Sequence, residues 1–221
     1  MNLIHSERFA SWARGHMVCR RDGVADRFAL TFDDGPSPTA TPRVLDRLAG
    51  AGARATFFTL AHNVRRSPAL LRRMRSEGHE IAAHGDLHLL PPPLMPRWWV
   101  GIEIRRSIAA VVAAGGERPR HYRPPFGIMM PGQAAYVRQL GLEPVIGDVY
   151  PEDPHRPGTA RIVERVVSRL RAGSIVILHD GCPLVDADRM QTVDALGPIL
   201  AHAQRAGLRS VTLRELLAGA P

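Results

Sequence analysis

Two adjacent aspartates, Asp33 and Asp34, follow an apolar run and begin an Asp-Asp-Gly-Pro turn. Two ionised carboxylates that are buried side by side repel each other unless a cation neutralises one of them. Farther along the chain, His84 and His88 share a His-x-x-x-His spacing, which would place both imidazoles on one side of a helical turn, within reach of one metal ion. The pattern predicts that Asp34, His84 and His88 bind a divalent cation while Asp33 accepts a proton from water. Taken singly, the same residues also fit an ordinary acidic turn and a chance pair of histidines.

These residues lie where predicted strands end. Apolar runs bounded by turn residues predict strands at 28–32, 55–60, 80–83, 121–123, 144–146, 174–178 and 208–212. Helical periodicity predicts helices at 42–49, 68–78, 98–114, 133–140, 160–171, 186–206 and 213–218. This alternation indicates an α/β fold, and a distorted (β/α) barrel of about seven parallel strands is the expected architecture. Asp33, Asp34, His84, Arg123 and His179 would then lie at the carboxyl ends of the strands, where such a barrel collects its active site.

A chain of 221 residues with 45% hydrophobic and 23% charged residues has the composition of one globular domain. We expect residues 1–27 to be an N-terminal extension and residues 28–221 to form the domain. The two cysteines, Cys19 and Cys182, lack the close spacing of a thiolate metal site. Residues 1–18 contain no apolar run of the length that a signal peptide requires, and no segment approaches the roughly 20 apolar residues of a membrane span, so we expect a cytoplasmic location.

The chain is strongly basic, with a formal net charge of +8, and all 29 basic residues are arginines. Such a charge would permit binding to phosphates, anionic polymers or acidic membrane surfaces. The arginines are scattered from Arg8 to Arg214, whereas a nucleic-acid-binding protein more often concentrates them beside aromatic residues or along one helix. We therefore expect a solvated, arginine-rich surface and no nucleic-acid partner.

Four short motifs combine the candidate residues with their neighbours. They are Thr31-Phe32-Asp33-Asp34-Gly35-Pro36, His84-x-x-x-His88, Arg123-Pro124-Pro125-Phe126 and Leu178-His179. Their order and separations resemble those of the NodB-type polysaccharide deacetylases, also called carbohydrate esterase family 4. The resemblance extends over most of the chain, about 28–217. It implies the NodB homology fold and a metal-dependent hydrolase that acts on the acetyl groups of carbohydrates.

The resemblance also implies a role for four residues in proton transfer: Asp33 as the general base, Arg123 as the residue that holds the base, His179 as the general acid, and Asp153 as the carboxylate that tunes the acid. Side-chain chemistry agrees with these roles. An arginine beside a carboxylate favours its ionised form, and an imidazole can donate a proton near neutral pH.

The metal ligands implied by the resemblance are Asp34, His84 and His88. The cation is expected to be Zn²⁺, with Co²⁺, Ni²⁺ and Mn²⁺ as alternatives. Substrate contacts are implied for Phe126, Pro125 and Leu178. The backbone N–H of Phe126 would stabilise the oxyanion together with the metal, and Leu178 would line the pocket for the acetyl methyl group.

One stretch departs from the family pattern, which usually has an aspartate followed by tryptophan. Here Asp153 offers the carboxylate, Pro154 replaces the tryptophan, and Gly147 stands where related proteins often have another tryptophan. The loss of aromatic surface leaves open a substrate other than chitin or peptidoglycan. Gly85 stands where many members have serine or threonine, which we interpret as a difference in how that loop is held.

Four further residues lie close to the motifs, namely Trp98, Trp99, Asp86 and Asp180. We expect the two tryptophans to pack at the start of a helix, with stacking against a sugar or an acyl chain as the alternative. For the two aspartates we expect solvated or supporting roles.

The leading hypothesis is hydrolysis of an N-acetyl group on an amino sugar, a short oligosaccharide or a polysaccharide, and the expected partner is a carbohydrate or a small acylated amino sugar. A deformylase, another linear amide hydrolase or an O-acetyl esterase acting on a sugar lipid or small metabolite is the first alternative, because one fold and site can serve several acyl substrates. A catalytically silent protein that uses its basic surface to bind an anionic polymer or nucleic acid is the second. The presence of base, ligands, arginine and acid together argues against it. The sequence does not define the oligomeric state.

Overall fold

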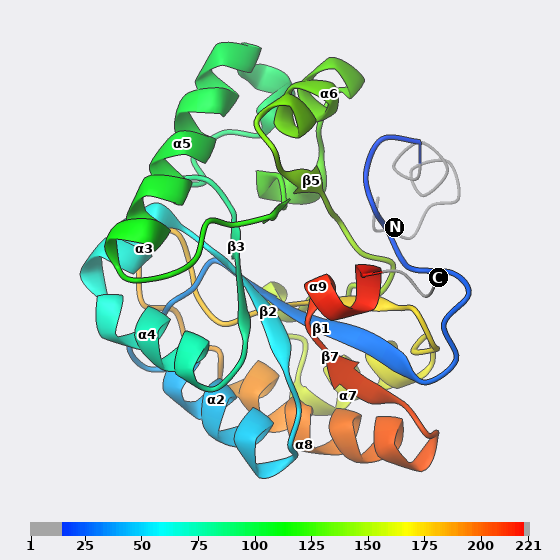
Figure 1. Ribbon diagram of the computed structural model, residues 1–221. Coiled ribbons are helices and arrows are strands. Elements are labelled where there is room, and N and C mark those ends of the chain that lie inside the picture. The colour runs from blue at the N-terminus through cyan, green and yellow to red at the C-terminus, as the bar shows by residue number, and fades with distance from the viewer. Residues whose placement is uncertain (1–14, 219–221) are drawn as a thin grey trace.

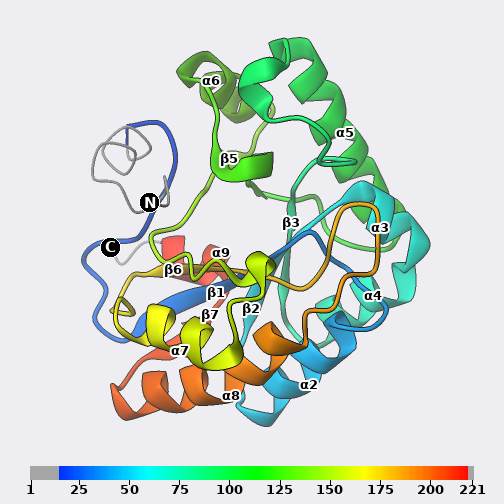
Figure 2. The ribbon, with the colours of Figure 1, turned by 180° about the vertical axis from the view of Figure 1, so that it is seen from behind.

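The apolar run at Arg27–Asp33 forms the central strand of a seven-stranded parallel sheet that curls into a partial barrel surrounded by helices (Figures 1 and 2). The computed structural model describes residues 15–218. Its strands are β1 (Arg27–Asp33), β2 (Ala55–Thr59), β3 (Glu80–Ala83), β4 (His121–Tyr122), β5 (Glu143–Pro144), β6 (Ile175–His179) and β7 (Arg209–Val211). Its α-helices are α2 (Thr41–Gly50), α3 (Ala61–Arg66), α4 (Pro68–Ser76), α5 (Arg97–Ala113), α6 (Pro131–Gln139), α7 (Thr159–Val167), α8 (Met190–Arg205) and α9 (Leu213–Leu217). The predicted α/β class and distorted barrel are confirmed.

The register of the sheet brings the ends of distant strands together. The strand order is β5-β4-β3-β2-β1-β6, and β7 pairs with the first half of β1. Asp33 at the end of β1 lies opposite Phe58 of β2 and His179 of β6. Ala83 at the end of β3 lies opposite Tyr122 of β4. The residues that follow these strands therefore share one end of the barrel.

The barrel is closed by short contacts in place of a regular ladder. Among residues 15–218, no ladder joins β5 to β6. Single bridges instead link Val18 to Val145 and Val149 to Val176. Val18 belongs to the predicted N-terminal extension, so the described part of that extension contacts the sheet, while residues 1–14 lie outside the described part of the chain.

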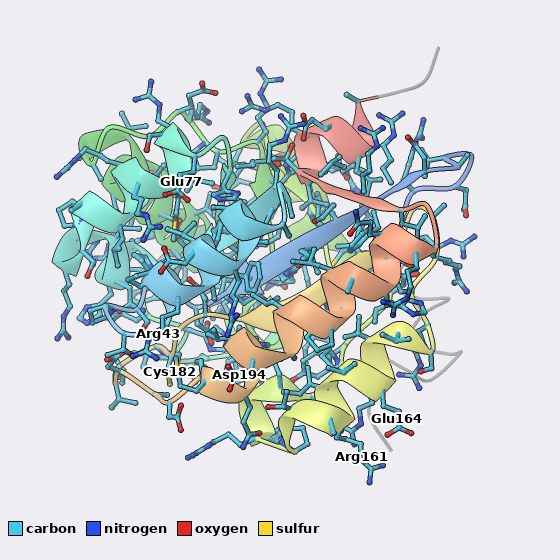
Figure 3. The ribbon with its side chains drawn as sticks, turned by 90° about the horizontal axis from the view of Figure 1, so that it is seen from below. Arg43, Glu77, Arg161, Glu164, Cys182 and Asp194 are labelled. Atoms are coloured by element: carbon cyan, nitrogen blue, oxygen red, sulfur yellow. The ribbon has the colours of Figure 1, made fainter. Side chains whose placement is uncertain are left out.

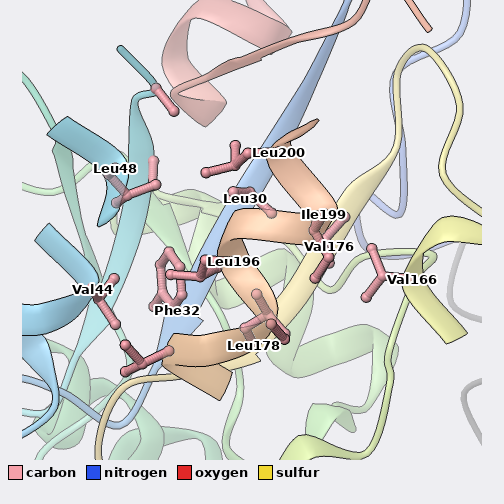
Figure 4. Close-up of a cluster of buried hydrophobic side chains, with 14 of the residues drawn as sticks. Leu30, Phe32, Val44, Leu48, Val166, Val176, Leu178, Leu196, Ile199 and Leu200 are labelled. Carbon is pink, nitrogen blue, oxygen red and sulfur yellow. The ribbon is translucent and has the colours of Figure 1, made fainter. Parts of the chain in front are cut away.

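A large apolar cluster fills the space between the sheet and helices α2, α7 and α8 (Figure 4). It includes Leu30, Phe32, Val44, Leu48, Val166, Val176, Leu178, Leu196 and Ile199. Side chains alternate between the two faces of a strand, so the residues between these in β1 and β6 point to the barrel interior. Thr31, Asp33 and His179 are therefore directed away from the helices.

Three elements differ from the predictions. The short helix α3, which follows β2 almost directly, was not predicted, because its six residues show no clear helical period. Helix α8 begins at Met190 and not near residue 186, because Arg189 turns back to donate a hydrogen bond from Nε to the Gly181 carbonyl (2.8 Å). Residues 84–88 were expected to make a helical turn, and that prediction is wrong, because the chain forms a loop there.

Many arginine side chains, such as Arg43 and Arg161, extend from the surface (Figure 3), whereas Arg123 and Arg189 are buried. Many pair with acidic neighbours: Arg161 Nε lies 3.8 Å from Glu164 Oε2, and Arg73 Nη2 lies 2.5 Å from Asp46 Oδ1. Exposed pairs of this kind contribute little to stability. None of the helices in residues 15–218 combines the length and apolar character needed to cross a membrane.

Candidate active site

The three predicted metal ligands converge at the carboxyl end of the barrel. His84 Nε2 lies 3.4 Å from Asp34 Oδ1, and His88 Nε2 lies 3.8 Å from the same oxygen. One donor atom from each of the three side chains lies within 4.8 Å of the other two. Asp34 and His84 are buried and His88 is partly buried. The three groups can therefore share one ion.

The hydrogen bonds of this cluster show that it fits a cation. His84 Nδ1 lies 2.8 Å from the Arg123 carbonyl oxygen, which can only accept, so Nδ1 carries the proton. In the neutral ring, the lone pair of His84 Nε2 faces Asp34 Oδ1, a buried oxygen for which the described residues provide no hydrogen-bond donor. Two acceptors that face each other in a buried site favour a metal ion between them, and a histidine ligand commonly donates its other N–H to a carbonyl in this way.

Electrostatics also favours metal binding by these groups. Burial lowers the pKa of His88 to about 4, and the neighbouring His84 adds to this effect. Burial alone would raise the pKa of Asp34, but the surrounding imidazoles outweigh it and hold that pKa at about 2. Near neutral pH, His88 is therefore neutral and Asp34 is ionised, which are the forms that coordinate a cation.

The loop that carries the histidines depends on unusual backbone angles. Gly85 and His88 have φ values of 92° and 55°, and Asp34 in the loop after β1 has a φ of 70°. A left-handed conformation costs glycine little, so Gly85 suits this position. Glu103 of α5 fastens the loop, because its Oε2 accepts the N–H of Asp86 at 2.9 Å. The two imidazoles thus meet through a turn of the loop and not through a helical period.

Asp33 is held by Arg123 in the barrel interior. Both side chains are buried, and Arg123 Nη1 donates to Asp33 Oδ1 at 2.6 Å. The same nitrogen donates to Thr31 Oγ1 at 2.7 Å, and the guanidinium carbon lies 4.1 Å from the centre of the Phe58 ring. Burial lowers the pKa of Arg123, and the charge of Asp33 opposes this effect. A charge-assisted hydrogen bond in a buried site fixes the orientation of the Asp33 carboxylate.

His179 lies beside Asp33 in the sheet and pairs with Asp153. His179 Nδ1 lies 3.0 Å from Asp153 Oδ1, and the His179 backbone N–H donates to Asp153 Oδ2 at 2.8 Å. The Thr192 hydroxyl donates to the same Oδ2 at 2.8 Å. Burial would lower the pKa of His179, but the charge and hydrogen bond of Asp153 outweigh it, so that the pKa is raised. The structure therefore places an imidazole that favours its protonated form next to Asp33.

The structure explains why a glycine occupies position 147, in the stretch that departs from the family pattern. At Gly147, where φ is 130°, a Cβ atom would lie 2.7 Å from a side-chain atom of Ile177 and 2.8 Å from the carbonyl oxygen of Ile175. No larger residue fits this position without movement of the strand. Tyr150 brings one aromatic ring close to the site, with its ring centre 6.1 Å from that of His179.

The predicted substrate contacts occupy different places. Phe126 is half exposed, its ring centre lies 4.4 Å from that of His88, and its backbone N–H points toward His88 Nε2 at 3.4 Å. Pro125 is buried beside Gly85. Leu178 is fully buried in the cluster that packs against α8, on the face of the sheet opposite to His179 (Figure 4). Its position therefore does not support the expected acetyl pocket, because the pleat of β6 turns it away from the site.

The two aspartates next to the histidines are buried and not solvated. Asp86 forms an ion pair with Arg65 at 2.5 Å. Asp180 accepts a hydrogen bond from the Thr41 hydroxyl at 2.5 Å, and burial raises its pKa to about 7. Both have supporting positions around the site.

One supporting residue carries no sequence signal of its own. Asn63 of α3 donates from Nδ2 to the Asp34 carbonyl at 2.7 Å and to the Cys182 carbonyl at 3.0 Å. It joins the loop after β1 to the loop after β6. Because its partners are remote in sequence, spacing could not identify it.

The assembled groups are a buried cation site, a carboxylate held by arginine, and an imidazole held by a second carboxylate. Together they can activate water, stabilise a developing negative charge and protonate a leaving group, which are the requirements of acyl hydrolysis.

Comparison with known proteins identifies the family. The family model for polysaccharide deacetylase matches residues 20–145. The chain is 40% identical to a chitooligosaccharide deacetylase of Bradyrhizobium sp. (strain ANU 289), with 85% of this chain and 89% of that protein covered. It is 36% identical to a peptidoglycan-N-acetylglucosamine deacetylase of Bacillus cereus, with coverages of 86% and 87%. A crystal structure of a peptidoglycan N-acetylglucosamine deacetylase bound to 4-naphthalen-1-yl-N-oxidanyl-benzamide superimposes with a TM-score of 0.85 at 26% identity, over 95% of this chain and 97% of that one. The chain is therefore a hydrolase of the polysaccharide deacetylase family.

Proposed function

We propose that this protein removes the acetyl group from an N-acetylglucosamine unit of a short chito-oligosaccharide. The observation that carries the proposal is the convergence of Asp33, Asp34, His84, His88 and His179 at one end of the barrel. The relatives named above act on chitooligosaccharide and on peptidoglycan N-acetylglucosamine, and both substrates present the same N-acetylamide to the enzyme. The higher identity to the former favours a soluble oligosaccharide.

Asp33 is proposed to be the general base. Its carboxylate is fixed by Arg123 in a buried position, so it can accept the proton of an attacking water without rotating away. Thr31, on the same face of β1 as Asp33, supports the same arginine, because its hydroxyl accepts from Arg123 and donates to the Val176 carbonyl. A chain of hydrogen bonds therefore orients the base: it runs from Asp33 to Arg123, which follows β4, then to Thr31 of β1 and to Val176 of β6.

His179 is proposed to be the general acid. Its Nδ1 proton is held by Asp153, which leaves Nε2 to donate a proton to the amine that departs from the sugar. Asp153 receives three hydrogen bonds and therefore stays fixed while the ring changes its charge. Expulsion of an amine needs such a proton, because an amide anion is a poor leaving group.

Asp34, His84 and His88 are proposed to hold Zn²⁺. One carboxylate and two imidazoles with open positions suit Zn²⁺, and also Co²⁺, Ni²⁺ or Mn²⁺. A cation there would act as a Lewis acid toward the acetyl carbonyl and would raise the acidity of water. The Phe126 N–H points into the same space and could supply a second donor to the oxyanion.

The test is acetate release from fully N-acetylated chitotetraose, called chitotetraose below, by protein stripped with EDTA and then reloaded with one metal at a time. We expect the stripped protein to be inactive, and Zn²⁺ or a close substitute to restore activity. N-formyl and O-acetyl analogues, assayed in parallel, decide the acyl group. Turnover of the formyl or ester substrates alone would overturn the N-acetyl assignment, and full activity after verified metal removal would overturn the metal assignment.

A further inference from the structure

Most of the exposed apolar side chains follow strands that end at the same end of the barrel. Among residues 15–218, ten large hydrophobic side chains are exposed. Nine of these lie on the segments that leave the carboxyl ends of β3, β4 and β6, which is the end of the barrel that carries the active site. The tenth, Val112, lies near the end of α5. Single exposed hydrophobic residues are ordinary, but this concentration marks an interaction surface.

These nine residues form what we call the apolar rim. Its largest part follows β3 and comprises Leu89, Leu90, Leu94, Trp98 and Trp99, with exposures from 40% for Trp99 to 71% for Leu94. Phe126 and Met130 follow β4, and Leu184 and Val185 follow β6. The prediction that the two tryptophans pack at the start of a helix is thus wrong in part, because both begin α5 but remain exposed.

The rim is held in place by the fold. Gln133 of α6 donates from Nε2 to the Pro92 carbonyl at 2.6 Å and to the Met95 carbonyl at 2.9 Å. Helices α5 and α6 lie side by side (Figures 1 and 2). The Phe126 ring contacts the ring of His88, so this part of the rim borders the active site. A segment fixed in this way presents its leucines and tryptophans to solvent without rearrangement.

The chemistry of the rim favours one kind of partner. Residues 89–99 contain one charged residue, Arg97, and no carboxylate, hydroxyl or amide side chain. A glycan would contact the tryptophans but gain little from the leucines, since sugars are bound by hydrogen bonds and by the faces of aromatic rings. Leucine and tryptophan next to exposed arginine are typical of surfaces that enter the boundary of a lipid bilayer. A second copy of this chain would bring like charges together, because the net charge is +8.

We propose that the apolar rim binds the surface of a bilayer that contains anionic phospholipid. The leucines and tryptophans would enter the interface, and exposed arginines such as Arg97 and Arg105 would contact the lipid phosphates. The active site would then face the bilayer surface. This inference does not depend on the proposed substrate, because attachment needs no catalysis.

The experiment measures binding of the full chain to vesicles by co-sedimentation. We expect binding to vesicles of phosphatidylglycerol and phosphatidylcholine, and weaker binding to phosphatidylcholine alone. The variant Leu94→Ser/Trp98→Ser should bind at least about tenfold more weakly, because each side chain loses its transfer to the lipid. Val112→Ser, which removes an exposed hydrophobic residue outside the rim, is the matched control and should bind like the unmodified chain. Asp33→Asn should also bind normally, which separates this test from that of the catalytic proposal.

Several results would overturn the proposal. Absence of binding to the anionic vesicles at low salt would do so, as would equal binding by Leu94→Ser/Trp98→Ser and Val112→Ser. A raised KM of the double variant for soluble chitotetraose would show that the rim holds the glycan chain instead. A dimer in sedimentation velocity that the double variant abolishes, without vesicle binding, would assign the rim to self-association. A second variant, Leu89→Ser, guards against a folding defect in the first.

Discussion

Replacing Asp153 by asparagine tests the acid role of His179 while preserving the shape of the site. Asp153 accepts hydrogen bonds from Nδ1 and the backbone N–H of His179 and from the hydroxyl of Thr192. In Asp153→Asn one carboxylate oxygen becomes an NH₂ group, which cannot accept. If the remaining oxygen keeps Thr192 and the backbone N–H, both of which bond to Oδ2, the NH₂ group faces Nδ1. The protonated ring of His179 then loses its partner.

The expected fall in kcat follows from the hydrogen bond that is lost. A hydrogen bond to a charged group contributes about 1.5–3 kcal/mol. Each 1.4 kcal/mol corresponds to a factor of about ten in rate, so kcat should fall by about one to two orders of magnitude at mildly alkaline pH. The variant should also change how the activity depends on pH. Asp153 raises the pKa of His179, and a general acid works only when protonated, so activity is lost as the pH rises through that pKa. Without the carboxylate this loss should begin at lower pH.

The assay is kcat for acetate release from chitotetraose by metal-loaded protein across mildly acidic to mildly alkaline pH. Asp148→Asn is the matched control, because Asp148 belongs to the same stretch but accepts from the Ile175 N–H at 2.9 Å. In Asp148→Asn the alkaline limb of the pH profile, where kcat falls as the pH rises, should lie at the same pH as in the unmodified chain. An unchanged alkaline limb in Asp153→Asn, or an equal displacement in both variants, would refute the assignment of His179 as the acid tuned by Asp153.

Three further predictions follow from the packing of the site. Thr31→Val removes the hydroxyl that accepts from Arg123, so steady-state kinetics should show a kcat reduced about tenfold with KM nearly unchanged, and an altered KM alone would contradict this. Asp34→Asn should fold but retain much less than one metal ion per chain after dialysis, as measured by elemental analysis, and full retention would exclude Asp34 as a ligand. Gly147→Ala should lower the free energy of unfolding in urea by about 1–3 kcal/mol, because a Cβ there meets β6. Gly50→Ala in α2, whose Cβ meets nothing within 4 Å, should not lower it. Equal stability of both variants would count against the packing at Gly147.

The strands could be predicted from the sequence because their residues are buried on both faces. The apolar run predicted at 28–32 is β1 at Arg27–Asp33, and the run predicted at 174–178 is β6 at Ile175–His179. In a parallel sheet such runs are nearly continuous and end at turn residues. The positions of Asp33 and His179 at strand ends follow directly from this pattern, and the convergence of distant residues follows from parallel strand order.

Other features could not be predicted because they depend on contacts between distant segments. The spacing of His84 and His88 matches a helical period, but positive φ angles place the two rings together through a loop. Leu178 belongs to a recognisable motif, yet only the pleat of β6 shows that it faces the helices. The exposure of Trp98 and Trp99 likewise depends on how α6 holds the preceding loop, which the local sequence does not encode.

The most direct test of the proposed chemistry is one comparison of acetate release from chitotetraose by the metal-loaded chain and by its Asp33→Asn variant, with metal content measured in both. If Asp33 is the base and Asp34, His84 and His88 hold the cation, the variant should keep its metal and lose activity by about 10²–10⁴-fold. Comparable activity in the variant, or loss of activity only in proportion to lost metal, would contradict the division of roles between the two neighbouring aspartates.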